Sequence, residues 1–235
     1  MAADLDSWPG RNKREPRRTQ AGWSVRQPLV DWLRREGAAA TGKTVLDIGC
    51  GDKPYYPFFA TAEKFFGVDV QDNPNADLHG AVEAIPAPDD SYDIVLCTQV
   101  LEHADDPALA VREMHRVTKP GGRVLASTHG TMVYHPNPVD HWRWTHTGLE
   151  RLFGDNGDWS SVVVEPGAGT ASGLAMLLAR VVHLLFKRAH AASLATPIIL
   201  ALNAGAHTLD AKVPSLTEKR TGALFANFHV TAVKR

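Results

Sequence analysis

The residues best suited to chemistry in this 235-residue sequence are two glycines and two aspartates at the ends of apolar runs. The run 44–48 leads into Gly49 and Gly51, and glycine there lets the main chain turn tightly and approach a ligand. Asp47 lies inside the end of that run, where a bare carboxylate is costly unless it meets a cation or donors. Asp69 closes the next run, 18 residues after Gly51, where a carboxylate can accept hydrogen bonds from both hydroxyls of a ribose. The pattern predicts a nucleoside-binding loop.

The glycine loop departs from the dinucleotide fingerprint. That fingerprint, G-x-G-x-x-G, needs a third glycine for close helix–strand packing beside the pyrophosphate. Pro54 occupies the third position, and Asp52 adds negative charge near the place of a pyrophosphate. These features favour a ligand with a ribose, a cationic amine and no phosphate, such as S-adenosylmethionine, over NAD. An NAD-dependent oxidoreductase stays as the alternative.

Apolar runs that predict strands alternate along the chain with segments that predict helices, and these elements must position the residues named above. A helix candidate capped by Asp106, with Pro107 in its first turn, separates two of the apolar runs. Runs that are apolar on both faces suit parallel strands covered by helices, so the chain is predicted to be a doubly wound α/β sheet. In such a sheet, ligands bind at the carboxyl ends of the strands. The predicted strands are 44–48, 65–70, 92–98, 123–128, 161–165 and 225–233.

Four motifs in order, over about residues 43–130, carry a resemblance: VLDIGCGDKPY, FFGVDV, AVEAIPAPDDSYDIVLCTQVLEHADDP and REMHRVTKPGGRVLAST. They resemble the class I S-adenosylmethionine-dependent methyltransferases, and most closely the type 11 group. The resemblance implies a single Rossmann-like domain with seven strands, mostly parallel with an antiparallel last strand. It implies methyl transfer to an oxygen, nitrogen or carbon atom of an acceptor. A module that binds S-adenosylmethionine without catalysis is a further alternative.

The resemblance also implies cofactor contacts at individual positions. The methionine half would meet Asp47, Gly49 and Gly51, the ribose Asp69, and the adenine Val70, Val82 and Glu83, with Gln99 lining the cofactor at the end of the middle strand. One departure concerns the adenine. Where the family often has an acid followed by a small residue, this chain has Ala81 and Val82, so contacts there come from main-chain groups or from Glu83.

A second polar segment, 134–145, follows the fourth predicted strand. It resembles the H-x-x-P-x-D-x-x-R-x-T segment of bacterial enzymes associated with surface-glycan or lipid biosynthesis, which implies a glycan, lipid-linked or small-molecule acceptor. Acceptor binding is assigned to Tyr134, Asp140 and Arg143, and the alternative is an Asp140–Arg143 pair that fastens the loop. The candidate general bases are His103, His135 and His141.

Other partners are disfavoured by composition and spacing. The 25 Lys and Arg residues balance 26 Asp and Glu, so a basic field for nucleic acid is absent. The histidines at 129–146 lack the spacing of known zinc motifs, and no metal is predicted. Two cysteines in apolar runs exclude a disulfide framework and suit a reducing compartment. With no signal peptide and no uncharged apolar run of membrane-spanning length, a cytoplasmic protein is expected.

Residues 1–20 are expected to be a mobile, solvated tail, and residues 21–235 one domain in which a helix at about 21–40 closes over the cofactor. Two apolar helices, at about 172–188 and 197–211, form a predicted insertion. They are interpreted as a lid or a homodimer face. The alternative is contact with a greasy acceptor or a membrane surface, helped by Lys187 and Arg188. A monomer and a homodimer are both compatible with the sequence.

Overall fold

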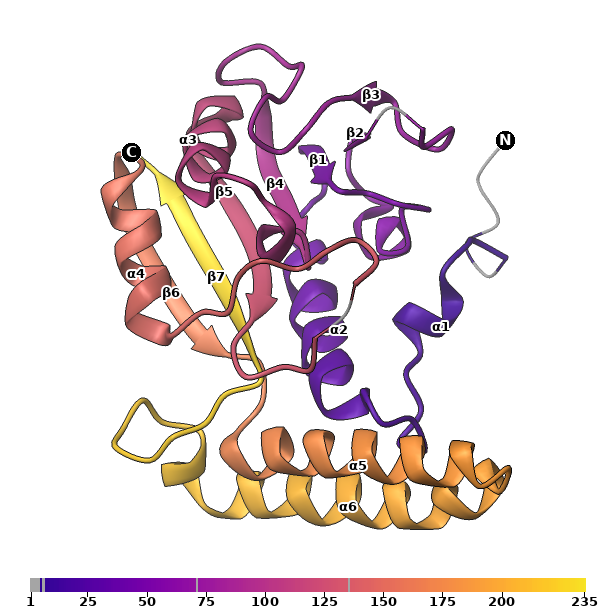
Figure 1. The fold of residues 1–235 in the computed structure, drawn as a ribbon. Coiled ribbons are helices and arrows are strands. Elements are labelled where there is room, and N and C mark those ends of the chain that lie inside the picture. Colours follow the sequence, from indigo (N-terminus) through magenta and orange to yellow (C-terminus); the bar gives the residue numbers. More distant parts are fainter. Residues whose placement is uncertain (1–4, 6, 71, 135) are drawn as a thin grey trace.

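A seven-stranded sheet forms the centre of the protein, in a computed structural model that describes residues 5, 7–70, 72–134 and 136–235 (Figure 1). The strand order is β3-β2-β1-β4-β5-β7-β6. The pairs β2–β3, β1–β2, β1–β4 and β4–β5 are parallel, and β7 runs antiparallel to both β5 and β6. This confirms the predicted α/β sheet with its antiparallel last strand. The strands are β1 Thr44–Ile48, β2 Lys64–Asp69, β3 Leu78–His79, β4 Tyr92–Thr98, β5 Thr118–His129, β6 Trp159–Pro166 and β7 Asn227–Lys234.

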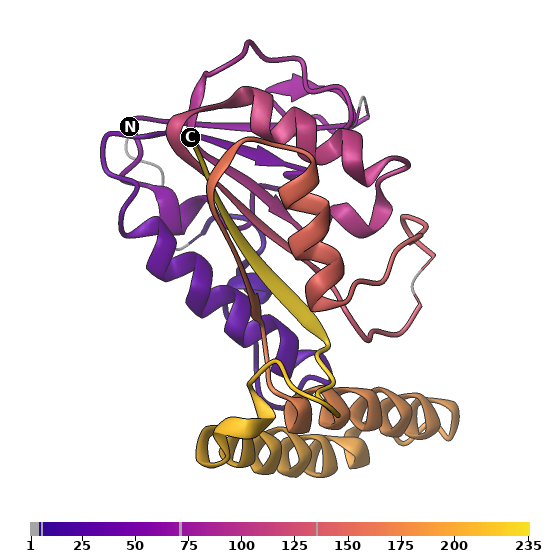
Figure 2. The same ribbon diagram turned by 90° about the vertical axis from the view of Figure 1, so that its left-hand side faces the viewer.

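Helices cover both faces of the sheet, as Figure 2 shows with α2 on one side and α3 and α4 on the other. The α-helices are α1 Arg11–Arg14, α2 Trp23–Gly37, α3 Pro107–Val117, α4 His146–Asp155, α5 Thr170–Arg188 and α6 Ala192–Lys212. Three short 3-10 helices are η1 Tyr56–Phe59, η2 Leu101–His103 and η3 Pro214–Leu216. Asp106 caps α3 as predicted, because its carboxylate accepts the Leu109 N–H at 3.0 Å.

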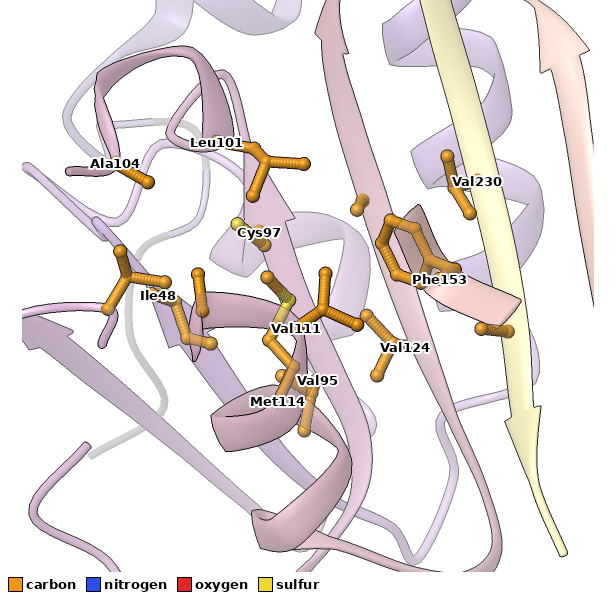
Figure 3. Packing of buried hydrophobic residues seen from close by; sticks show 14 of the residues in the cluster. Ile48, Val95, Cys97, Leu101, Ala104, Val111, Met114, Val124, Phe153 and Val230 are labelled. Carbon is orange, nitrogen blue, oxygen red and sulfur yellow. The ribbon is translucent and has the colours of Figure 1, made fainter. Parts of the chain in front are cut away.

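The core lies in two layers, one on each face of the sheet. On one face, Val95 and Val124 pack with Val111 and Met114 of α3 (Figure 3). On the other face, strand residues pack under α2, as Leu96 does beneath Leu33. The central strands are therefore buried on both sides, which explains their unbroken apolar sequences. Helices and core together fix the carboxyl ends of β1, β4 and β5 along one edge of the sheet.

The α5–α6 hairpin crosses that edge, below the strand ends in Figure 1. It forms the connection between β6 and β7. The predicted second helix began at Pro197, whereas α6 begins at Ala192 and contains Pro197 within it. Only small faces of the hairpin are buried, around Met176 and Ile199. Its outer face is exposed and apolar, and its large side chains are Leu174, Leu178, Val181, Leu184, Leu185, Leu194, Ile198, Leu200 and Leu209.

The N-terminal strap, residues 7–20, packs against the domain, so the prediction of a mobile tail is wrong for these residues. Arg14 is buried and donates to the carbonyl oxygens of Trp8, Pro9 and Pro54. The Trp8 indole donates to the Lys53 carbonyl at 2.9 Å. A guanidinium carries five donors in a fixed fork, so one buried arginine can hold the strap on the glycine loop. The basic composition of this segment predicts a solvated tail and gives no indication that Arg14 binds the glycine loop.

Candidate active site

The glycine loop after β1 leaves open space beside its main chain. Gly49 and Gly51 have φ values of 65° and 52°, in the left-handed region that favours glycine. A Cβ atom on Gly49 would lie 2.3 Å from Val100, whereas one on Gly51 would meet nothing within 4 Å. Gly49 is therefore required by packing, and Gly51 faces a volume that a ligand can fill.

Asp69 lies beside this space and is held by the loop. Its Oδ2 accepts the Gly51 N–H and the Asn73 amide, both at 2.8 Å, and its Oδ1 accepts the Val70 N–H at 2.8 Å. A carboxylate offers about four acceptor positions, which leaves capacity at Oδ1 for a ribose hydroxyl. Val70, the next residue, is 62% exposed, so an apolar surface for an aromatic base adjoins the carboxylate.

Asp47 is buried at the end of β1, and its Oδ1 has no hydrogen-bond partner among the described residues. Burial raises the pKa of Asp47 to about 7; Asp69 raises it further, and Lys53 and Lys13 oppose the change. A buried carboxylate with an unused oxygen is stabilised by a cationic ligand. The pair Asp47 and Asp69 thus fits a molecule that has both a ribose and a positive charge, as S-adenosylmethionine does.

Glu83 and Gln99, two further predicted cofactor residues, are both fastened to their neighbours. Glu83 accepts the Asp105 N–H at 2.7 Å and so orders the loop before α3, while Val82 is buried in the core. Gln99 has a φ of 58°, an unusual conformation for a residue other than glycine. Its side-chain amide donates to Ser127 and Asn227, both at 3.1 Å. Because Gln99 lines the cavity described next, its strained backbone marks the floor of the site.

A cavity of about 750 Å³ opens at the carboxyl ends of the strands. We call it the active-site cavity. Its floor is formed by the ends of β4 and β5, one wall by the strap and the start of α2, and the opposite wall by the α5–α6 hairpin. The lining residues include Lys13, Gly22, Arg26, Tyr55, Gln99, Glu102, His103, His129, Met132, Val133, Arg180 and His183.

Glu102 and His129 form a buried dyad in the floor of this cavity. His129 Nε2 lies 3.1 Å from Glu102 Oε1, and Glu102 Oε2 accepts the Thr128 hydroxyl at 2.9 Å. Glu102 has 0% of its surface exposed, and its burial raises its pKa to about 7. A carboxylate that orients an imidazole on a cavity wall can position that ring to take up a proton.

Sequence reasoning missed the dyad, because it weighed His129 only as a metal ligand. The signal was available: β4 and β5 pair in parallel with Thr98 opposite Ser127, so residues just beyond those positions meet at one edge. Among the described residues, no three His, Cys, Asp or Glu side chains gather as metal ligands.

The three histidines predicted as bases have different positions. His103 lines the cavity, with its Nδ1 2.9 Å from the Val139 carbonyl oxygen. His141 is exposed and is not among the described residues that line the cavity; its main-chain N–H donates to the Glu102 carbonyl at 2.8 Å. The main chain of His141 thus supports Glu102, and the assignment of its side chain as a base stays a prediction. His135 lies outside the described residues.

Of the predicted acceptor-binding residues, Asp140 and Arg143 hold their own loop in place, and acceptor binding by the three residues stays a prediction. Asp140 is buried and paired with Arg143, whose guanidinium also donates to the carbonyls of Val133 and Trp142. Tyr134 is 66% exposed. None of these three described residues lines the cavity, to which the same loop contributes Met132 and Val133. The Asp140–Arg143 pair is the alternative to acceptor binding that the sequence itself offers. The two residues are three positions apart, so their ion pair holds the loop locally.

The element after the glycine loop argues against a dinucleotide. Residues 49–63, all of which are described, contain only η1, a four-residue 3-10 helix. Dinucleotide sites place the pyrophosphate at the N-terminus of an α-helix that starts in this loop. Pro54, in the place of the third glycine, instead contacts the strap through Arg14.

Comparisons with known proteins agree with this geometry. Residues 23–158 match the family model described as a methyltransferase domain. The ubiquinone biosynthesis O-methyltransferase of Pseudomonas paraeruginosa is 36% identical over 118 residues, which are 42% of this chain and 49% of that protein. An uncharacterized methyltransferase of Mycobacteroides abscessus is 35% identical over 112 residues, 41% of this chain and 43% of that protein. The chain thus spans about half the length of these curated relatives.

The fold is also found in solved structures. The YcgJ protein of Bacillus subtilis matches with a TM-score of 0.53 and 21% identity, over 89% of this chain and 98% of that one. Phosphoethanolamine N-methyltransferase 2 of Haemonchus contortus, solved with S-adenosyl-L-methionine, matches with a TM-score of 0.55 and 19% identity, over 88% of this chain and 52% of that one. Together with the family model, which covers more than half of the sequence, these findings lead to one conclusion: the chain belongs to the methyltransferase domain family, among the class I S-adenosylmethionine-dependent methyltransferases.

Proposed function

We propose that this chain transfers a methyl group from S-adenosylmethionine to a nucleophilic atom of an acceptor held in the active-site cavity. The cofactor supplies an activated methyl group on a cationic sulfur. One observation carries the proposal: the carboxylate-and-glycine cradle of Asp47, Gly51 and Asp69 and the cavity with the Glu102–His129 dyad in its floor both lie at the carboxyl ends of the strands. Alignment of the acceptor atom in a shielded site can supply several kcal/mol of the barrier.

The chain's own residues would have separate roles in cofactor binding and in catalysis. Asp69 holds the ribose, Asp47 faces the positive charge, and the strap covers the glycine loop from outside. The dyad serves an acceptor that must lose a proton, with His129 nearest to the cavity and Glu102 orienting its ring. His103 lines the same cavity and stays as the other candidate base. An acceptor nitrogen or carbon that is already nucleophilic would need alignment only.

Binding of the demethylated product, S-adenosylhomocysteine, tests the cradle by calorimetry. We expect tight binding by the unaltered chain and a loss of at least about tenfold in Asp69→Ala, because hydrogen bonds to a charged group are removed. Asp155→Ala, at an exposed position on α4, is the matched control. Binding of NAD in place of S-adenosylmethionine would overturn the proposal.

Incubation with methyl-labelled S-adenosylmethionine and fractionated cell extract tests turnover. Label should appear in one fraction and disappear with Asp69→Ala. If the chain binds the cofactor but no fraction takes up label, the result would indicate a module that binds S-adenosylmethionine without catalysis.

We also propose a reducing, cytoplasmic compartment. Cys50 and Cys97 are both free and buried. Burial raises the pKa of the Cys50 thiol to about 12, and the pKa of the Cys97 thiol is raised by the same cause. Such thiols are poor nucleophiles, as expected for cysteines that serve only in packing.

The outer face of the α5–α6 hairpin is proposed as a contact surface for an anionic lipid membrane. Both helices are long and apolar enough to cross a membrane by length and composition. In addition, only 28% of the most apolar 18-residue stretch of α5 and 17% of that of α6 is buried inside the protein. Residues 170–212 contain a single acid, Asp210, which is buried and accepts the N–H groups of Ala171 and Ser172. The exposed charges there, Lys187 and Arg188 among them, are cationic, so two copies meeting on this face would bring no opposite charges together. An anionic surface would complement it.

A further inference from the structure

The N-terminal strap brings a charged side chain to the active-site cavity. Asn12 and Lys13 of the strap line this cavity, together with Arg26 of α2 and Tyr55. The strap precedes residues 23–158, the part of the chain that matches the methyltransferase domain. The match to that domain therefore gives the strap no role, and a role has to be inferred from its contacts.

The strap is attached to the domain on both sides of Lys13. On one side, Arg14 donates to the Pro54 carbonyl oxygen at 2.8 Å, next to the glycine loop. On the other side, the side-chain amide of Asn203 donates to two carbonyl oxygens near the end of the strap, at 2.6 Å and 3.0 Å. Asn203 lies on α6 and has 0% of its surface exposed, so this second attachment comes from the hairpin. The main chain that carries Lys13 is thus held against the cavity.

Lys13 lies where the carboxylate-and-glycine cradle and the cavity approach each other. It lines the cavity, and it is close enough to Asp47 to oppose the rise in the pKa of that carboxyl that burial causes. Tyr55 also lines the cavity; burial raises the pKa of its hydroxyl, Arg26 opposes the change, and Asp47 adds to it. Both residues therefore belong to the cavity and lie within electrostatic reach of Asp47. Methyl transfer to an acceptor in the cavity requires the methionine half of the cofactor to lie at this junction.

The methionine half of S-adenosylmethionine carries a carboxylate as well as cationic groups. Its amine and sulfonium suit Asp47 and Asp69, whereas its carboxylate is repelled by both and needs a cation of its own. Lys53, the other lysine that acts on Asp47, already forms an ion pair with Asp77 at 2.7 Å. Lys13 forms no ion pair with any carboxylate in the described part of the chain. The ammonium group of Lys13 therefore has the charge, the position and the free capacity to receive this carboxylate.

We propose that the strap is part of the cofactor site and that Lys13 binds the carboxylate of the cofactor's methionine half. The inference rests on the proposed methyltransferase function and adds a residue to its cofactor site. Two other cations of the lining are directed elsewhere, since Arg26 lies against the Tyr55 hydroxyl and Arg180 packs onto Gly22. Through Asn203, the hairpin that walls the cavity also keeps the strap over the cofactor.

Calorimetry on the full chain with two ligands tests the role of Lys13. The ligands are S-adenosylhomocysteine and its decarboxylated analogue, which keeps the amine and lacks only the carboxylate. We expect the unaltered chain to bind S-adenosylhomocysteine about tenfold or more tightly than the analogue. Lys13→Gln should weaken binding of S-adenosylhomocysteine by about tenfold or more, because a charge-assisted hydrogen bond is lost, and should not weaken binding of the analogue. Lys13→Arg keeps the charge and should retain the preference. Arg17→Gln, at an exposed position of the strap, is the matched control and should retain it too.

The outcomes separate this inference from the proposed function. Failure of S-adenosylhomocysteine to bind the unaltered chain would count against the proposed function itself. Equal binding of the two ligands by the unaltered chain, or a preference that survives Lys13→Gln, would overturn the role of Lys13 alone. Equal weakening of both ligands in Lys13→Gln would also overturn it, because the lysine would then act on the cofactor site as a whole and not on the carboxylate.

Discussion

Glu102 is the residue whose chemistry depends most on its surroundings. Its carboxyl has no exposed surface and carries a pKa raised to about 7, mainly by burial. The folded protein therefore holds the Glu102 proton more tightly than the unfolded chain does. As pH rises from the ordinary value of a glutamate to about 7, the unfolded state ionises first, and the free energy of unfolding falls.

Glu102→Gln should remove this part of the pH dependence, because an amide oxygen can still accept the Thr128 hydroxyl but cannot ionise. Urea unfolding at about pH 5 and about pH 7 measures it. We expect the loss of stability over this range to shrink by about 1–3 kcal/mol in the variant. The pKa of Asp47 is also raised by burial, so the free energy of unfolding of the variant should still fall somewhat over this pH range. An unchanged slope in Glu102→Gln, matching that of the exposed-site variant Glu63→Gln, would contradict the assignment.

The positions of the residues in the proposed cofactor cradle could be predicted because these residues lie at the ends of strands or directly after them. Asp47, Gly49, Gly51 and Asp69 need only the local rule that strand ends meet ligands, and their geometry agrees with that rule. Arg180 could not be found in the same way. It is over 150 residues from Gly22 in sequence terms, and only the packing of the hairpin on α2 brings the two together.

At the scale of elements, the strap is the part that sequence patterns misrepresent. Helix α1 has only four residues, and five cations surround a single acid there, so no periodicity indicates order. The order comes from tertiary hydrogen bonds between Arg14 and three carbonyl oxygens. Helix α4 gives a smaller example: its cap is Thr145, which accepts the Gly148 N–H, and not Thr147, although Thr147 and Glu150 have the spacing of a capping box.

Arg14→Ala should release the strap from the glycine loop. Three carbonyls lose their donor, so hydrogen exchange of the amides at residues 8–20 should accelerate by about tenfold or more. Native-state exchange followed by mass spectrometry measures this. Arg17→Ala changes an exposed arginine of the same segment and should leave exchange unaltered. Equal exchange in the two variants would show that Arg14 does not hold the strap.

At the scale of the whole molecule, the exposed apolar residues gather on one side. Leu178 and Leu185 are 55% and 58% exposed on the outer face of α5. The double variant Leu178→Gln, Leu185→Gln should reduce sedimentation with vesicles of phosphatidylcholine and phosphatidylserine by about tenfold or more, since each buried leucine contributes about 1–2 kcal/mol. Leu109→Gln, on α3, is the control.

Two results would count against the membrane surface. One is equal binding of the double variant to the vesicles. The other is a concentration-dependent dimer in light scattering that the double variant abolishes, with no vesicle binding by the unaltered chain; that result would assign the face to a second copy.

The β6–β7 connection has a consequence for how such proteins diversify. β6 runs toward the edge of the sheet where the cavity opens and β7 runs away from it, so whatever joins them must emerge at that edge. Insertions of different length and character can be accommodated there without altering strand register. Recognition of a new acceptor can therefore be acquired by exchanging one contiguous segment, while the nucleoside-binding half remains untouched.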